Sequence, residues 1–270
     1  MNKWESNYQL GETLTQEQID SFDKNGVIVF RNFITAEKVS AYLQEIKRLE
    51  KTWIEEKRDK INGIPLKFGK DELGNKTIQR LCFTSLYSDA LHELLNDPRL
   101  NQLYKLLTPY EGRIAENEKD GLVVNNYLNT LNSSFSQMGW HTDSPRDLFL
   151  GQKIMPMLNV GIHLDECLFE NGGLRVLPTT HKQNVLKLLF GKKYFIDNKD
   201  DKDEVGFDMH PGDLSVHDGR LWHRVKQSPK FGEESRRRVM YVPIVTGKYK
   251  PKDDNSKTPF YHIFTSKVHK

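Results

Sequence analysis

A histidine and an aspartate two residues apart, His141 and Asp143, form the stretch of this chain best suited to chemistry. The residues before them are typical of a β-strand, and side chains two apart on a strand point to the same face. Both could therefore bind one metal ion from the same side, with His223 from a neighbouring strand as the third ligand. Two imidazoles and one carboxylate are the ligand set of non-haem iron(II) sites and leave half of an octahedron open. Zinc accepts the same residues, so a hydrolytic zinc site stays open at this point.

A second histidine competes with His223 for the third position. His217 lies shortly before it, and the intervening Asp218-Gly219 pair is typical of a bend. Because the bend changes the direction of the chain, we expect only one of the two histidines to face the metal. Spacing alone does not choose between them.

Composition limits the classes of protein to which the chain can belong. Charged residues make up 29% of the 270 residues and hydrophobic residues 37%, which is ordinary for a globular protein. The net charge of +3, with no basic stretch interleaved with aromatic residues, argues against nucleic acid as a partner. We expect no membrane span and no signal peptide, because no apolar run is long enough. Two cysteines are too few for a secreted disulfide framework, so we predict buried thiols in a cytoplasmic protein.

The pattern of hydrophobic residues predicts a single domain over 1–270. Residues 14–110 are mostly helical, with a capping box at Thr15, a helix end at Asn25-Gly26 and an amphipathic helix after Thr35. Short strand-like runs separated by turn residues then fill the core at 121–247, which suggests a sandwich or barrel with helices outside. These runs are 122–129, 136–143, 157–165, 174–176, 213–217, 222–227 and 237–245. We expect 61–75 to be a loop, 191–205 a solvated loop, and 248–270 a polar tail docked by its aromatic cluster, Phe260, Tyr261 and Phe264.

Several segments, taken together, give the chain a resemblance to the phytanoyl-CoA dioxygenase (PhyH-like) family of iron(II)/2-oxoglutarate-dependent oxygenases. The resemblance covers about residues 14–245 and implies a mainly β fold, a double-stranded β-helix (jelly roll, cupin-like) with flanking helices. The segments occur in this order: Trp140-His141-Thr142-Asp143, Glu170-Asn171-Gly172-Gly173-Leu174, Val176-Leu177-Pro178-Thr179-Thr180-His181-Lys182, Pro211-Gly212-Asp213-Leu214, His217-Asp218-Gly219-Arg220-Leu221-Trp222-His223 and Ser235-Arg236-Arg237-Arg238.

Carried over residue by residue, the resemblance implies that His141, Asp143 and His223 bind iron(II), and it prefers His223 to His217. It also implies that Arg237 binds the distal carboxylate of 2-oxoglutarate, for which a guanidinium offers a matching fork. Its neighbours Arg236 and Arg238 compete for this role, but adjacent residues on a strand face opposite sides. Asn126 is similar in position to a polar residue that contacts 2-oxoglutarate in some relatives.

The family pattern further implies oxidation of a substrate by dioxygen, with succinate and carbon dioxide as coproducts. Hydroxylation of an unactivated C–H bond is the default outcome, and the carboxylate of Asp143 argues against halogenation, because halogenases have a small residue there. One departure is Val225, where a small polar residue or glycine is common.

The substrate is expected to be a small, anionic metabolite or natural-product intermediate, because arginines lie near the metal motif in the sequence. The residues proposed to contact it are Arg146, His163, Arg175 and Trp222. Two other classes of function stay open: a zinc hydrolase on the same scaffold, and a jelly-roll binding protein without catalytic activity.

Overall fold

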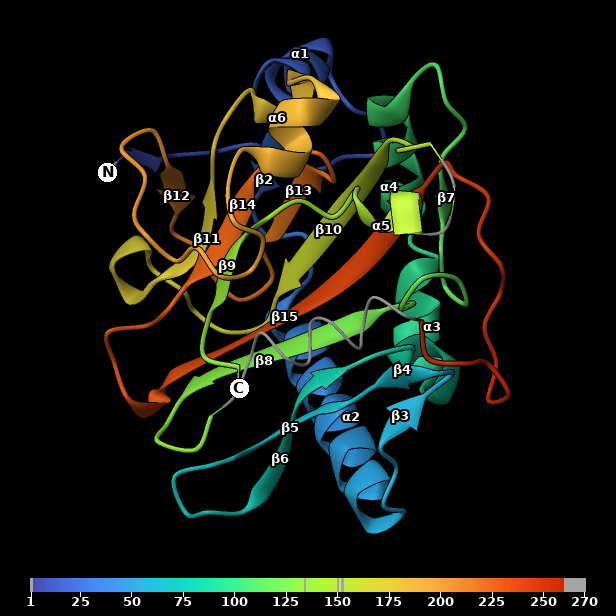
Figure 1. Cartoon of the computed structure of the whole chain (residues 1–270), viewed down its shortest axis with the longest axis vertical. Coiled ribbons are helices and arrows are strands. Elements are labelled where there is room, and N and C mark those ends of the chain that lie inside the picture. Colours follow the sequence, from blue (N-terminus) through green and yellow to red (C-terminus); the bar gives the residue numbers. More distant parts are fainter. Residues whose placement is uncertain (1, 134, 150, 152, 260–270) are drawn as a thin grey trace.

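Two β-sheets packed face to face form the core of the structure, a computed structural model that describes residues 2–133, 135–149, 151 and 153–259 (Figure 1). Neighbouring strands in both sheets are antiparallel, except for the parallel pair β1 and β12. The larger sheet has the order β2 (Val27–Phe30), β13 (Leu214–Asp218), β10 (Met157–His163), β15 (Gly232–Val245), β8 (Val123–Asn129), β6 (Lys76–Leu81), β5 (Lys67–Lys70), and β7 (Arg113–Ile114) also pairs with β15. The smaller sheet has the order β1 (Asn2–Trp4), β12 (Val205–Phe207), β11 (Gly173–Val176), β14 (His223–Lys226), β9 (Met138–His141).

Helices cover the outer face of the larger sheet, where its apolar side chains form the main hydrophobic core. The helices that contribute to this core are α1 (Gln16–Asn25), α2 (Ala36–Glu55), α3 (Asp89–Leu95) and α4 (Pro98–Gln102). Two shorter helices are α5 (Arg146–Phe149) and α6 (Val185–Phe190), and none of their described side chains belongs to this core. Figure 1 shows α2 running behind the larger sheet, and its buried face includes Tyr42, Ile46 and Trp53. The capping box at Thr15 and the left-handed end at Gly26 are both present in α1, as predicted. None of the described helices is long and apolar enough to cross a membrane.

Each strand predicted after residue 121 is present, with ends shifted by a few residues. The expected loop at 61–75 is different: it holds β3 (Lys60–Ile61), β4 (Ile64–Pro65) and β5, which pairs with β6 as a hairpin. This hairpin forms because β6 pairs with β8 and so extends the larger sheet. The backbone N–H of Ile78 also donates to the carboxylate of Glu50 on α2, at 2.6 Å. The aromatic cluster expected to dock the tail, Phe260, Tyr261 and Phe264, lies outside the described residues.

The space between the sheets contains the polar side chains that matter for function. Alternation along each strand decides which residues face this interior. On β10 they are Asn159, Gly161 and His163, and the residues paired with them across the larger sheet share the same face. Among these partners are His217 on β13 and Val239 on β15. The interior is therefore built from positions that can be read directly from strand register.

Candidate active site

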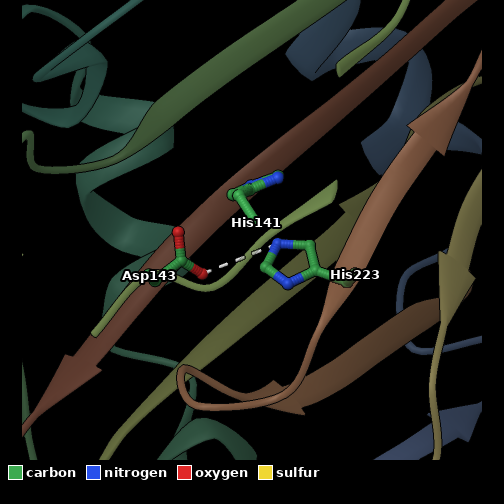
Figure 2. Close-up of side chains that lie close together, drawn as sticks. All are labelled: His141, Asp143 and His223. Carbon is green, nitrogen blue, oxygen red and sulfur yellow. Dashed lines mark ion pairs between the residues drawn. The ribbon is translucent and has the colours of Figure 1, made fainter. Parts of the chain in front are cut away.

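Three side chains meet at one edge of the interior and can hold a metal ion (Figure 2). One ligand atom from each of His141, Asp143 and His223 lies within 4.8 Å of the others. The rings of the two histidines are 4.1 Å apart between centroids, and Nε2 of His223 lies 3.7 Å from Oδ2 of Asp143. No other such group of histidine, cysteine, aspartate or glutamate occurs among the residues the structure describes.

Backbone carbonyls orient both imidazole rings. His141 on β9 and His223 on β14 are directly paired across the smaller sheet. The Nδ1 atom of His141 lies 2.8 Å from the carbonyl oxygen of Gly139, and that of His223 lies 3.0 Å from the carbonyl oxygen of Leu221. A carbonyl only accepts, so each Nδ1 carries the proton and each Nε2 keeps a free lone pair. This is the tautomer that binds metal through Nε2.

Asp143 reaches the site from a turn beyond the end of β9 rather than from the strand itself. Its backbone N–H donates to the carbonyl of Gly219, at 2.8 Å, so the bend between β13 and β14 fixes its place. The side-chain amide of Asn159 donates to its Oδ2 atom, at 3.0 Å. The aspartate is therefore held by the larger sheet and by the loop that precedes His223.

His217 lies beside this group but on the opposite sheet. Its Nε2 atom is 3.7 Å from Oδ2 of Asp143, and its ring centroid is 4.3 Å from that of His223. The residue is fully buried, and neither of its ring nitrogens has a hydrogen-bond partner among the described residues. Its pairing with Asn159 across the larger sheet places both side chains against the same carboxylate.

The protonation states of the three candidate ligands suit a metal ion. Burial lowers the pKa of His141, and burial together with the neighbouring His141 and His217 lowers that of His223 well below its usual range. Burial alone would raise the pKa of the Asp143 carboxyl, but the surrounding imidazoles, His217 foremost, hold it well below its usual range. Neutral imidazoles and an ionised carboxylate are the forms that coordinate metals.

A small cavity lies between the same two sheets, and β14, which carries His223, contributes Val225 to its lining. Its lining comes from both sheets and includes Tyr127, His163, Leu174, Val225 and Arg237. The guanidinium of Arg237 donates to the carbonyls of Lys226, at 2.8 Å, and Ser136, at 3.1 Å. No carboxylate among the described residues pairs with it, although it is buried. A buried guanidinium without an anionic partner is suited to binding a carboxylate from solution.

The arginines on either side of Arg237 are already paired. Arg238 forms a two-pronged ion pair with Asp165, with distances of 2.7 and 2.8 Å. Arg236 binds Glu233 and also donates to the side-chain oxygen of Asn126, at 2.9 Å. Both lie on the face of β15 opposite to Arg237, as alternation requires.

The structure does not bring Asn126 to the cavity. Asn126 is paired with Arg238, so its side chain lies on the outer face of the larger sheet. Its neighbours Asn125 and Tyr127 face the interior instead. We therefore correct the expectation by one residue, because a shift of one along a strand exchanges its two faces.

Two of the four residues expected to contact substrate also lie away from the site. Arg175 is paired with Arg224 on the outer face of the smaller sheet, where carbonyls of Phe169 and Gly172 accept its hydrogen bonds. Trp222 packs with Trp140 and Leu177 in a separate apolar cluster. In contrast, His163 lines the cavity. Arg146 follows Asp143 by three residues, and its guanidinium forms an ion pair with the carboxylate of Asp120 at 2.9 Å.

The segment 191–205 is not simply a solvated loop. Phe195 stacks on the ring of His141 with 4.7 Å between centroids, and the Tyr194 hydroxyl lies 2.7 Å from that of Thr142. Two backbone hydrogen bonds also join the segment to Trp140, one from the N–H of Phe195 and one to the carbonyl of Asp197. The aromatic pair within this Lys- and Asp-rich segment was the only sequence signal for these contacts.

Comparison with known proteins agrees with this geometry. A family model described as phytanoyl-CoA dioxygenase (PhyH) matches residues 22–231. The chain belongs to this family. The PhyH family comprises iron- and 2-oxoglutarate-dependent oxygenases, so the recognition made from the sequence motifs is confirmed.

The relatives compared with this chain share little sequence identity with it. Ectoine dioxygenase of Bordetella parapertussis is 22% identical over 178 residues, which cover 65% of this chain and 52% of that protein. The matched stretch therefore spans about half of its length. Among solved structures, the carbocyclase SnoK from nogalamycin biosynthesis has a TM-score of 0.64 at 14% identity and covers 97% of this chain and 94% of its own.

Two further structures of similar fold contain bound groups. HygX from Streptomyces hygroscopicus, solved with nickel and 2-oxoglutarate, has a TM-score of 0.62 at 16% identity, covering 88% of this chain and 89% of its own. EctD from S. alaskensis, solved with bound Fe, has a TM-score of 0.63 at 16% identity, covering 93% and 82%. These likenesses confirm the predicted jelly-roll fold.

Proposed function

We propose that this PhyH-family chain is an iron(II)- and 2-oxoglutarate-dependent dioxygenase that hydroxylates an unactivated C–H bond of a small anionic metabolite. Succinate and carbon dioxide are the coproducts. The observation that carries the proposal is that His141, Asp143 and His223 converge between the same two sheets that enclose a small cavity lined by Arg237, whose guanidinium has no carboxylate partner among the described residues. A metal ion held by the three side chains would bind the 2-oxo acid end of 2-oxoglutarate, and the buried guanidinium would bind its distal carboxylate.

The donor set fits iron(II). His141, His223 and Asp143 would hold the metal through two imidazole nitrogens and one carboxylate oxygen, and an octahedral iron(II) would keep its remaining positions for exogenous ligands. Asn159 holds one oxygen of the Asp143 carboxylate by a hydrogen bond. Such a bond favours coordination through a single oxygen, because it competes for the lone pairs of the other.

The lining of the cavity suits the distal end of 2-oxoglutarate. In the proposed complex the guanidinium of Arg237 binds the distal carboxylate, and the backbone carbonyls of Lys226 and Ser136 fix its orientation. A guanidinium fork binds a carboxylate through two parallel charge-assisted hydrogen bonds. The apolar lining, which includes Leu174 and Val225, excludes water from the intervening chain and strengthens this pairing.

Iron(II) with 2-oxoglutarate and dioxygen supplies the oxidising power needed to break an unactivated C–H bond. The residues of this chain hold the metal, orient the cosubstrate and restrict access of water. Phe195 contributes to the last task by covering one face of the His141 ring. The carboxylate at Asp143 occupies the position that a halide would need, which supports hydroxylation over halogenation.

An anaerobic titration of the iron(II)-loaded protein with 2-oxoglutarate tests the proposal. We expect a visible charge-transfer band in wild type, loss of the band in Asp143→Ala, and no change in the matched control Asp203→Ala, whose side chain is exposed. Intact iron binding without a band would overturn the proposal. Turnover with zinc in the absence of dioxygen would favour a hydrolase instead.

The identity of the substrate is tested separately. Succinate release should rise above its basal rate when the correct compound is present, so a library of carboxylates, phosphates and amines can be screened by this readout. We expect anionic compounds to stimulate release, because Arg146 lies close behind the candidate ligands. Stimulation by cationic amines alone would contradict the proposed substrate class.

A further inference from the structure

Lys67 on β5 is a partly buried cation without an anionic partner. Its Nζ atom lies 4.5 Å from the ring centroid of Phe135, and among the described residues no carboxylate comes within ion-pair distance of it. The residue paired with it across the hairpin is a second cation, Arg80. Burial, together with the charge of Arg80, lowers the pKa of Lys67 to about 7. Removing a cation from water without an anion is costly, so such a group is suited to an anion that binds.

Strand register shows that Lys67 faces the same interior as the cavity. Lys67 pairs with Arg80, Arg80 with Asn125, Asn125 with Val239, and Val239 with His163. Paired residues point to the same side of a sheet, so these five form one row across five strands. The register shifts after Lys67, and the contact of its Nζ atom with the ring of Phe135 independently places it on this side. Val239 and His163 line the cavity that Arg237 also lines. Lys67 and Arg80 therefore extend the polar interior toward the edge of the larger sheet.

A pair of stacked aromatic rings separates Lys67 from Arg237. The rings of Tyr127 and Phe135 are 4.6 Å apart between centroids and nearly parallel, at 17°. Arg237 lies next to the tyrosine, with its Cζ atom 5.7 Å from the ring centroid, and Lys67 lies over the phenylalanine. One cation at each end of the stack provides two separate positions for anions. The proposed cosubstrate accounts for only the position at Arg237.

The neighbouring ion pairs leave few negative charges near Lys67. The carboxylate of Asp120 accepts from Arg80 at 2.7 Å and from Arg146 at 2.9 Å. A single carboxylate is thus shared by two guanidiniums. Positive charge is therefore in excess at this end of the interior, which favours an anionic group there.

We propose that Lys67, with Arg80 beside it, binds the anionic end of an elongated substrate, a carboxylate or a phosphate remote from the carbon that is oxidised. β5 lies three strand spacings from β15, roughly 14 Å, so this second anion position is well separated from the cosubstrate position at Arg237. The inference rests on the proposed function, because it assigns the second anion position to the substrate of that reaction.

The test compares anions with neutral analogues of the same length on the iron(II)-loaded, 2-oxoglutarate-bound protein under anaerobic conditions. Octanoate, octyl phosphate and octanamide are the probes, and calorimetry measures their dissociation constants. The variants are Lys67→Met, Lys67→Arg and the matched control Lys76→Met. Lys76 belongs to the same hairpin and also lies over a phenylalanine ring, Phe68, at 3.9 Å, but is exposed.

We expect wild type, Lys67→Arg and Lys76→Met to bind an anionic probe at least about tenfold more tightly than octanamide, and Lys67→Met to lose this preference. The same preference in Lys67→Met, or none in wild type, would overturn the inference. So would a tenfold weaker binding of 2-oxoglutarate to Lys67→Met, since that assigns the lysine to the cosubstrate. Absence of the charge-transfer band in wild type would instead contradict the proposed function. A normal band without any preference for anionic probes would contradict only the role of Lys67.

Discussion

Replacement of Arg237 by methionine should weaken binding of 2-oxoglutarate far more than it weakens binding of iron. Methionine keeps much of the aliphatic volume but removes the fork that donates to a carboxylate. A hydrogen bond to a charged group contributes about 1.5–3 kcal/mol, so two of them contribute roughly 3–6 kcal/mol. Since about 1.4 kcal/mol corresponds to a factor of ten, the dissociation constant should rise by about two to four orders of magnitude.

The assay is the anaerobic titration of the iron(II)-loaded variant, followed by the visible charge-transfer band. Arg236→Met is the matched control, because Arg236 lies on the opposite face of β15 and binds the exposed Glu233. Exposed ion pairs contribute about 0–1 kcal/mol, so the control should bind 2-oxoglutarate within about twofold of wild type and remain folded.

A second cosubstrate separates recognition by Arg237 from general damage to the site. 2-Oxopentanoate has the length of 2-oxoglutarate but ends in a methyl group. Wild type should prefer 2-oxoglutarate by a large factor, and Arg237→Met should bind both compounds with similar affinity. A variant that keeps the wild-type preference would refute the assignment of Arg237 to the distal carboxylate.

Three further predictions concern the metal group and its surroundings. His223→Gln should lose at least about tenfold in iron affinity whereas His217→Gln keeps iron, as measured by metal content after dialysis; the opposite result would exchange their roles. Phe195→Ala should lower the free energy of unfolding by about 1–2 kcal/mol and speed hydrogen exchange at the Trp140 amide, because the stacking on the metal-site histidine is lost; unchanged exchange would disprove the contact. Burial lowers the pKa of His163 to about 4, against about 6.5 in an unfolded chain, so the unfolded state binds the extra proton between these values. Its contribution to stability should therefore fall as pH decreases from about 6.5 toward 4, by at most about 1.4 kcal/mol per pH unit, and urea unfolding of His163→Gln should show a flatter dependence.

The strands of the core and the metal group could be predicted from the sequence because both depend on local patterns. Turn residues bracket each predicted strand after 121, and the family motifs fix the order of His141, Asp143 and His223. How the fold brings these three side chains together could be predicted only in part. Asp143 approaches from a turn held by the carbonyl of Gly219, a contact between segments far apart in the chain.

The errors arose where long-range pairing decides the structure. The Lys- and Gly-rich stretch at 61–75 has little strand character, yet β5 forms because β6 extends the larger sheet. Asn126 faces away from the cavity, which the sequence could not show because the register of β8 cannot be read across the loop at 131–138. Trp222 could have been excluded from the sequence alone, since neighbours on a strand face opposite sides and His223 faces the metal group.

The backbone bonds between Trp140 and the segment at 195–197 have a consequence for association between molecules. β9 is the outermost strand of the smaller sheet, and an outermost strand offers unpaired N–H and C=O groups to other chains. Phe195 and Asp197 occupy two of these groups next to His141. Substitutions that detach the segment at 195–197 would therefore expose the backbone edge of β9 next to His141. We expect such variants to self-associate as well as to lose iron.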